Sequence, residues 1–300
     1  MLKKLVLILG LSSLLFGAYN VKPEQISKTV YKFVGAIAAP SKENGGNMVN
    51  TYWVKGDTSW IVIDTGPSYN YAKACHEQMK KIANLPVKFV INTHEHNDHW
   101  LGNNYYKENG AKLLGTKSQS KVYPAGSHPH MLSVISKEDA KGTQVVALDQ
   151  HVVKSSVEKI DGRDLEFLHF DYKIHTPEDF MVYLQDEKVL FSGDLLFSQR
   201  ITSIRDGSVE GGLKSLDFIE GLDVKVFAIG HGKHTDNTSV KQMRKYFLAL
   251  KEAAMKAIED GQDVNEFVKT ADFKAFEHMG LFKELHKSNL GFAFTEYEFF

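Results

Sequence analysis

The sequence predicts a mixed α/β protein, of the α+β kind, in which two β-sheets stack face to face and helices lie outside them. Two observations lead to this prediction. Short runs rich in valine, isoleucine and aromatic residues occur in both halves of the chain, and each half also has segments with helical spacing. Sheets and helices with one apolar face are stable when those faces are buried against each other. The chain has 300 residues, 43% of them hydrophobic, so it can bury such a core.

The first half begins with strands and then alternates strands with helices. Three early strands predict an antiparallel start. A turn at residues 64–67 breaks that pattern, and apolar residues recur at helical spacing after it. The predicted strands cover residues 30–39, 47–55, 59–64 and 87–92, and the predicted helices cover residues 69–82 and a stretch from about residue 100.

The second half repeats this order, and no low-complexity linker separates the two halves. We therefore expect residues 19–300 to form a single domain. The aromatic-rich tail at residues 263–300 is expected to pack onto the core rather than to form a partner surface. The predicted strands cover residues 152–160, 165–170, 180–184, 189–192 and 224–229, and a helix is predicted over residues 240–258.

Residues 1–18 have the layout of a secretory signal peptide. Lys3 and Lys4 precede an apolar run that is followed by the small pair Gly17-Ala18. This run is shorter than the roughly 20 residues that a membrane-spanning helix needs, and no cysteine follows it to accept a lipid. We therefore expect export to the periplasm, cleavage of the signal, and no stable membrane anchor.

The overall charge excludes one class of partner. The chain has 36 basic and 37 acidic residues, whereas a protein that binds nucleic acid would be more basic. We expect a small-molecule substrate instead, and nothing in the sequence indicates an oligomeric state. The single cysteine, Cys75, cannot form an internal disulfide, and its place in a helical pattern indicates a packing role.

A cluster of metal-binding side chain types follows the predicted strand at residues 87–92. His94, His96, Asp98 and His99 fall within six residues. Residues two apart in an extended stretch share one face, so His94 and His96 can bind one ion. Asp98 and His99 lie where the chain turns and can face a second ion. The alternative, a polar surface turn, would require this clustering by chance among only 13 histidines.

Three further candidates lie beside strand ends or turns: His175, Asp194 and His231. Each residue alone is weak evidence for a metal site, because a single histidine or aspartate after a strand is more often a hydrogen-bonded turn residue. Their joint occurrence, in this order and spacing, favours ligands of a shared metal site over three unrelated turns.

These candidates, with Asp64, resemble the five ordered motifs of the metallo-β-lactamase superfamily over about residues 30–235. The resemblance implies that family's αββα sandwich, which agrees with the two strand-rich halves. It also implies that Asp64 orients the cluster from the preceding strand end. The implied ligand sets are His94, His96 and His175 for one metal and Asp98, His99 and His231 for another, with Asp194 bridging both.

Nitrogen and oxygen ligands suit zinc first, with two Zn²⁺ per chain, and iron or manganese are alternatives. Two cations ~3.5–4 Å apart lower the pKa of a bridging water toward ~7, which supplies hydroxide without a serine or cysteine nucleophile. Asp98 would orient that hydroxide and take its proton. The resemblance therefore implies a zinc metallohydrolase that acts on a small ester, lactone, thioester or amide.

Departures from named branches of the family narrow the substrate by exclusion. Asp194 occupies the bridging position, where the zinc β-lactamases have cysteine or serine, so we expect at most weak β-lactamase activity. The segment around His175 lacks the glycines that flank this histidine in many relatives. Residues 62–67 and 92–103 look most similar to exported metallohydrolases associated with sulfur-oxidation and quinoprotein systems. Two alternatives stay open: a mononuclear iron enzyme that oxidises a persulfide, and a binding protein without turnover.

Loops after the histidine cluster and after Asp194 carry further polar side chains. Such loops commonly hold substrate-contacting groups, although each residue could equally be a solvated loop residue. Arginines that face the cleft would favour an anionic substrate. The candidates are Tyr123, His128, His130, Arg200 and Arg205, and His234 is a candidate to support His231.

Overall fold

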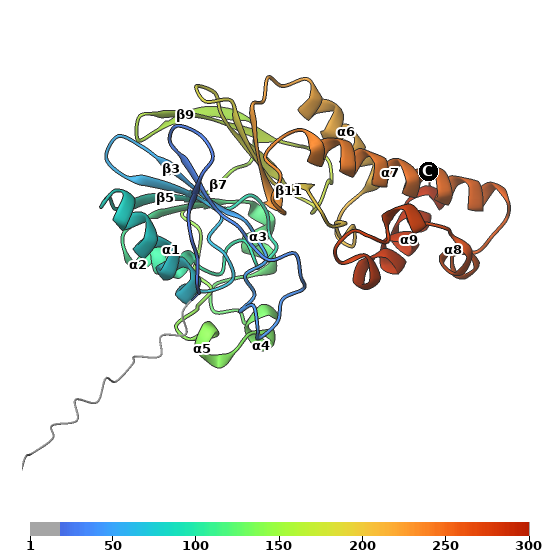
Figure 1. Ribbon diagram of the computed structural model, residues 1–300, viewed down its shortest axis with the longest axis horizontal. Helices are drawn as coiled ribbons and strands as arrows, with labels where there is room; N and C mark the ends of the chain where they lie inside the picture. The colour runs from blue at the N-terminus through green and yellow to red at the C-terminus, as the bar shows by residue number, and fades with distance from the viewer. Residues whose placement is uncertain (1–18, 300) are drawn as a thin grey trace, which may run out of the picture.

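Two β-sheets face each other in the computed structural model, and helices lie on the outer side of each sheet (Figure 1). This is the layered α/β arrangement that the sequence predicts. The structure describes residues 19–299. The signal peptide predicted over residues 1–18 therefore lies outside the described residues. Within residues 19–299, no helix is both long and apolar enough to cross a membrane.

The first sheet is built from the N-terminal half of the chain. Its strands, in spatial order, are β1 (Glu24–Gln25), β2 (Val30–Phe33), β3 (Thr51–Lys55), β4 (Trp60–Ile63), β5 (Val87–Ile91), β6 (Lys112–Gly115) and β7 (Gln150–His151). Strands β1 to β4 pair antiparallel, which confirms the predicted antiparallel start. Strands β4 to β7 are parallel, so helices and loops must carry the chain back between them.

The second sheet is built from the C-terminal half. Its strands are β8 (Ser156–Ile160), β9 (Arg163–His169), β10 (Phe180–Leu184), β11 (Val189–Phe197) and β12 (Val226–His231). Strands β8 to β11 pair antiparallel in sequence order, and β12 lies parallel to β11 at the edge. Each sheet therefore contains a parallel pair whose strands end at the same edge.

Helices cover the outer faces of both sheets (Figure 1). The helices of residues 19–299 are α1 (Tyr69–Ile82), α2 (Asn103–Glu108), α3 (Lys117–Val122), α4 (Met131–Val134), α5 (Lys137–Ala140), α6 (Val209–Glu220), α7 (Thr238–Glu259), α8 (Val264–Thr270), the 3-10 helix η1 (Lys274–Phe276) and α9 (Phe282–Glu298). Helices α1 and α2 pack together on the first sheet, and α6 and α7 pack together on the second. Helix α9 packs against α7, α8 packs against α9, and both extend beyond the sheets (Figure 1).

The core has three apolar layers because side chains alternate between the faces of each strand. On β3, Tyr52 and Val54 are buried between the two sheets, whereas Trp53 is buried against the α1 side. On β10, Val182 is buried between the sheets, and Met181 is buried on the side of α6 and α7. Both faces of these central strands are therefore covered by apolar side chains.

Helix α1 has the bounds that the sequence predicts. The Ser68 side chain accepts a hydrogen bond from the Tyr71 backbone N–H and so fixes where the helix starts. Cys75 is buried on this helix, as the packing interpretation predicts. Helix α6 was not predicted, because Gly211 and Gly212 lower its helix propensity. These glycines allow close packing, since a Cβ atom at Gly212 would lie 2.3 Å from the Phe247 ring.

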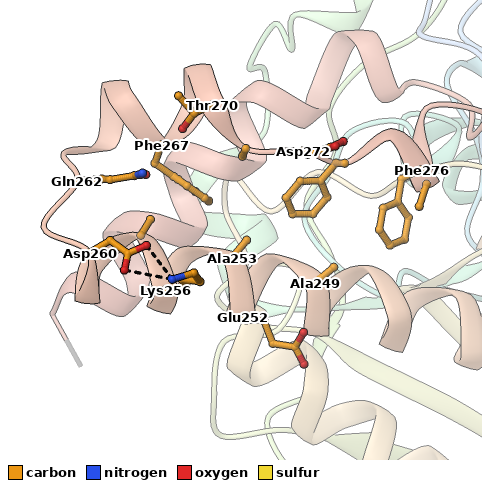
Figure 2. A pocket seen from close by; sticks show the side chains of 14 residues that line it. Ala249, Glu252, Ala253, Lys256, Asp260, Gln262, Phe267, Thr270, Asp272 and Phe276 are labelled. Carbon is orange, nitrogen blue, oxygen red and sulfur yellow. Dashed lines mark hydrogen bonds and ion pairs between the residues drawn. The ribbon is translucent and has the colours of Figure 1, made fainter.

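The predicted packing of the C-terminal tail is confirmed for part of it. Phe294 and Tyr297 are buried on α9, but Phe299 is 84% exposed. A cavity of about 460 Å³ lies between α7 and the segment formed by α8 and η1, lined mainly by alanine and phenylalanine side chains (Figure 2). Lys256 and Asp260 form an ion pair on its rim (Figure 2). None of the predicted metal ligands lines this cavity.

Candidate metal centre

The predicted ligands meet at one edge of the two sheets, where the parallel pairs end. The histidine cluster at residues 94–99 directly follows β5, and Asp64 directly follows β4. Asp194 lies within β11, and His231 is the last residue of β12. The carboxyl ends of parallel strands share an edge, so both pairs direct these side chains to the same cleft. The cluster forms a turn, so its side chains converge through loop geometry rather than by strand alternation.

Potential ligand atoms gather in two groups, and within each group they lie within 4.8 Å of one another. Asp194 belongs to one group and also approaches the other. Its Oδ2 atom is 3.2 Å from His175 Nε2 and 3.2 Å from His231 Nε2. The first group is His94, His96, His175 and Asp194, and the second is Asp98, His99 and His231. The family resemblance implies the same two sets of three residues, with Asp194 shared between them.

Asp64 orients two parts of the cluster. Its carboxylate accepts hydrogen bonds from the Thr93 backbone N–H at 2.9 Å and from His99 Nδ1 at 2.8 Å. The Thr93 hydroxyl donates to Asp64 Oδ2 and lies 3.0 Å from His94 Nδ1. Both imidazoles therefore use Nδ1 as a donor, which leaves the Nε2 lone pairs of His94 and His99 directed into the cluster.

The imidazoles of His96 and His231 are oriented in the same way by other partners. His96 Nε2 donates to Asp206 Oδ2 at 3.0 Å, and His96 Nδ1 lies 2.9 Å from His175 Nε2. His231 Nδ1 donates to the Met48 carbonyl at 2.6 Å, and its Nε2 faces Asp98 and Asp194. In each ring one nitrogen has a fixed partner and the other faces the cluster, which is the usual environment of a metal-bound histidine.

Asp179 positions His175. The Asp179 carboxylate accepts hydrogen bonds from the backbone N–H groups of His175 and Thr176 at 2.9 and 2.8 Å. The Thr176 hydroxyl donates to the same carboxylate. These bonds fix the turn before β10, so His175 reaches the site without flanking glycines.

Two glycines allow Asp194 to approach the cluster closely. Gly193 has φ +49°, and a side chain there would lie 2.5 Å from the Thr93 hydroxyl. A side chain at Gly230 would lie 2.0 Å from Asp194 Oδ1. The pairing of β11 with β12 shifts register around Gly193, and this bulge directs Asp194 into the cleft.

The residues present fit a metal centre. Four buried atoms in the cluster have no hydrogen-bond partner within residues 19–299: His94 Nε2, Asp98 Oδ2, His99 Nε2 and Asp194 Oδ1. Buried polar atoms without partners are costly, and a shared cation would satisfy all four. Burial, together with the neighbouring His99, holds the pKa of His94 well below its usual range. Neutral imidazole is the form that binds metal.

The carboxylates of the cluster favour positive charge on the groups between them. Burial by itself would raise the pKa of Asp194, but His231 and His99 hold it well below its usual range. Burial would lower the pKa of His99, but Asp194, Asp64 and Asp98 raise it well above its usual range. The cluster therefore stabilises a cation among its carboxylates, a role that metal ions would fill.

Residues 44–231 match the sequence profile of the Metallo-beta-lactamase superfamily, which is more than half of the chain. The chain belongs to the metallo-β-lactamase superfamily. Most members of this superfamily are metal-dependent hydrolases of small molecules. The histidine and aspartate cluster described above falls within the matched residues and is consistent with metal binding in this superfamily.

Individual relatives in the superfamily are distant. Beta-lactamase-like protein 2 homolog of Caenorhabditis elegans is 24% identical over 225 residues, which are 74% of this chain and 68% of that protein. Hydroxyacylglutathione hydrolase of Pelagibacter ubique (strain HTCC1062) is 25% identical over 173 residues, 53% of this chain and 62% of that protein. A metallo-β-lactamase from Pontibacter korlensis superposes with a TM-score of 0.59 at 20% identity, over 76% of this chain and 99% of that one.

A cleft of about 600 Å³ lies beside the cluster of predicted metal ligands. Four of the loop residues singled out in the sequence line it: Tyr123, His130, Arg200 and Arg205. Two do not. His128 is exposed outside the cleft, and the backbone N–H of His234 bonds to Ser198 Oγ rather than to His231. Within residues 19–299 no hydrogen bond joins His234 to His231, so the support role considered for His234 stays a prediction.

Sequence reasoning missed two residues that position the ligands, Asp206 and Asp179. Asp206 lies 110 positions from His96, and no local motif connects them. Asp179 had no clear local signal either, because the usual turn rule pairs an aspartate with backbone that follows it, whereas Asp179 accepts from the N–H groups of His175 and Thr176, which precede it.

Replacing Asp206 by alanine is expected to weaken metal binding by roughly 10- to 100-fold, because His96 loses the partner that fixes its ring. The bond to His96 also holds the pKa of Asp206 below its usual range, so this carboxylate is charged at neutral pH. Competition with a chelator of known affinity measures the effect. Asp206→Asn keeps an acceptor for His96 and should lose less. Equal metal affinity in all three proteins would contradict a positioning role.

Proposed function

We propose that the chain is a hydrolase that uses two zinc ions to cleave a small ester, lactone, thioester or amide. One observation carries the proposal. Imidazole and carboxylate atoms without hydrogen-bond partners converge in a buried cluster, while the opposite ring nitrogens of the histidines are held by other groups. A polar network that served only to stabilise the fold would pair these atoms with each other.

The ligand sets follow the two groups of atoms. His94, His96 and His175 would hold one ion, Asp98, His99 and His231 would hold the other, and Asp194 would contact both. When bound, paired divalent cations lower the pKa of a water molecule and polarise the carbonyl group under attack. Nitrogen and oxygen donors in this ratio suit zinc.

The chain itself supplies a base and a shaped cleft. Asp98 Oδ2 lies 3.4 Å from His231 Nε2, is buried without a hydrogen-bond partner within residues 19–299, and belongs to a residue that lines the cleft. It can orient the attacking water and accept its proton. Within residues 19–299 no cysteine lines the cleft, and its one serine, Ser203, has no hydrogen bond to a histidine or carboxylate that could act as its base. A covalent acyl-enzyme is therefore not part of the proposal.

Size and similarity support a small acyl substrate. A cleft of about 600 Å³ suits a small molecule. The similarity to a hydroxyacylglutathione hydrolase supports the inclusion of thioesters in the proposed substrate range. Asp194 at the bridging position argues against strong β-lactamase activity, as the sequence predicts.

The experiment that tests this function starts from the purified chain loaded with zinc. Metal content is measured, and esters, lactones, thioesters, amides and β-lactams are screened. We expect two zinc ions per chain, turnover of at least one acyl substrate, loss of turnover after chelation, and its return when zinc is added.

Two outcomes would contradict the proposal. One iron per chain, with oxygen consumed in the presence of a persulfide, would replace hydrolysis by oxidation. A fully metal-loaded protein that hydrolyses none of the acyl compounds would remove the hydrolase assignment and leave a metal-binding protein.

A further inference from the structure

Arg200 is buried in the wall of the cleft beside the metal cluster. Its side chain follows β11, lines the same cavity as Asp98 and Asp194, and leaves only 5% of the residue exposed. The guanidinium lies 5.3 Å from the centre of the Phe197 ring, and that ring stacks on the His231 imidazole. An arginine keeps its charge even when buried, so a permanent cation faces the cleft.

Arg200 has no ion pair within residues 19–299, unlike the other arginines of the chain. Arg163 pairs with Asp186, Arg205 pairs with Asp206, and Arg244 pairs with Asp217 and Glu220. A buried charge without a partner is costly in a folded protein. The exception therefore calls for a ligand that supplies the missing negative charge.

The protein contacts of Arg200 leave most of its donors unused. Nε donates to the Ile201 carbonyl at 3.2 Å. Nη1 lies 3.3 Å from His231 Nδ1, but that nitrogen already donates its proton to the Met48 carbonyl and cannot accept another. Nη2 has no hydrogen-bond partner in the described part of the chain. The fork of Nη1 and Nη2 is thus available to an oxyanion.

The other charges at the cleft do not neutralise Arg200. Asp98 and Asp194 belong to the ligand groups, so bound cations would more than offset their negative charge. The Asp206 carboxylate accepts a hydrogen bond from His96 and forms an ion pair with Arg205. Glu284 lies on the exposed rim of the cleft and forms no ion pair within residues 19–299.

We propose that Arg200 binds an anionic group of the substrate, so that the preferred substrates are acyl compounds that carry a carboxylate or sulfonate near the scissile bond. This rests on the proposed hydrolase function for its substrate class, while the anion site rests on Arg200 alone. Because the guanidinium contacts the ring of a ligand histidine, the anionic group and the scissile carbonyl must be separated by only a few bonds.

Two matched esters test the selectivity of the zinc-loaded protein: the p-nitrophenyl half-ester of adipic acid and p-nitrophenyl hexanoate, which differ by one carboxylate. We expect wild type to prefer the charged ester in kcat/KM. Arg200→Gln should lower that ratio by roughly 10- to 100-fold, as expected for a lost charged hydrogen bond. Arg200→Lys keeps the charge without the fork and should fall between the two. Arg244→Gln is the control and should keep the wild-type ratio, because Arg244 lies on α7, pairs with Asp217 and Glu220, and does not line the cleft.

A binding measurement separates failure of the anion site from failure of the hydrolase function. Calorimetry compares glutarate with valerate, because each has one carboxylate for the metals and only glutarate has a second. Wild type should bind glutarate roughly 10-fold more tightly, and Arg200→Gln should not distinguish the two. Equal binding by wild type, or a preference that survives in Arg200→Gln with normal metal content and melting temperature, would overturn the inference. A glutarate preference without turnover of any ester would remove the hydrolase function and keep the anion site.

Discussion

Asp194→Ala is expected to lower kcat/KM by about 1,000-fold or more and to remove at least one of the two metal ions. Among residues 19–299, Asp194 is the one carboxylate whose Oδ2 atom approaches histidines of both groups, at 3.2 Å from His175 Nε2 and 3.2 Å from His231 Nε2. Without this carboxylate, the clustered imidazoles lack the negative charge that helps to hold two cations close together. Loss of a group that only orients a ligand costs roughly 10- to 100-fold, so loss of a shared ligand should cost more.

Metal analysis and turnover on the best substrate of the panel measure this effect together. Asp260→Ala is a suitable control, because Asp260 pairs with the exposed Lys256 on α7, on the rim of a different cavity. It should keep two metals and wild-type turnover. If Asp194→Ala also kept both, the cluster would not be the reaction centre.

Strand β11 shows how far sequence patterns go in predicting this fold. The pattern ends the strand at residue 192 because Gly193 reads as a breaker. In the structure the strand continues to Phe197, since Gly193 forms a bulge with φ +49° and pairing with β12 resumes after it. A glycine that ends a strand and a glycine that bulges it look the same in one sequence. The strand predicted at residues 30–39 is too long rather than too short, because β2 ends at Phe33.

The site was more predictable than the elements around it. All seven proposed ligands come from short local motifs, and the structure brings their side chains together. Local motifs succeed here because strand ends of a layered sheet share an edge, whatever the exact strand lengths. Asp206 could not be predicted, because it reaches His96 only after two halves of the chain have stacked. That Arg200 lacks an ion pair also could not be predicted, because this depends on its neighbours in the folded chain.

Asp98 occupies the position where proton transfer and metal binding meet. The residue is buried, lines the cleft, and has Oδ2 at 3.4 Å from His231 Nε2 and 3.6 Å from His99 Nε2. If it acted only as a ligand, its loss would be repaired by excess zinc. If it also takes the proton of the attacking water, excess zinc would restore the metal but not the rate.

Asp98→Ala should therefore lower kcat by about 100- to 10,000-fold toward every acyl substrate in the panel, even at zinc concentrations that restore two metals per chain. Asp98→Asn keeps an oxygen ligand but accepts a proton poorly, so it should recover metal content more readily than rate. The measurement is kcat against zinc concentration, with bound metal determined at each point. Turnover that returns in full with the second metal would assign Asp98 to metal binding alone, and turnover unchanged without added zinc would exclude the hydrolytic mechanism at this cluster.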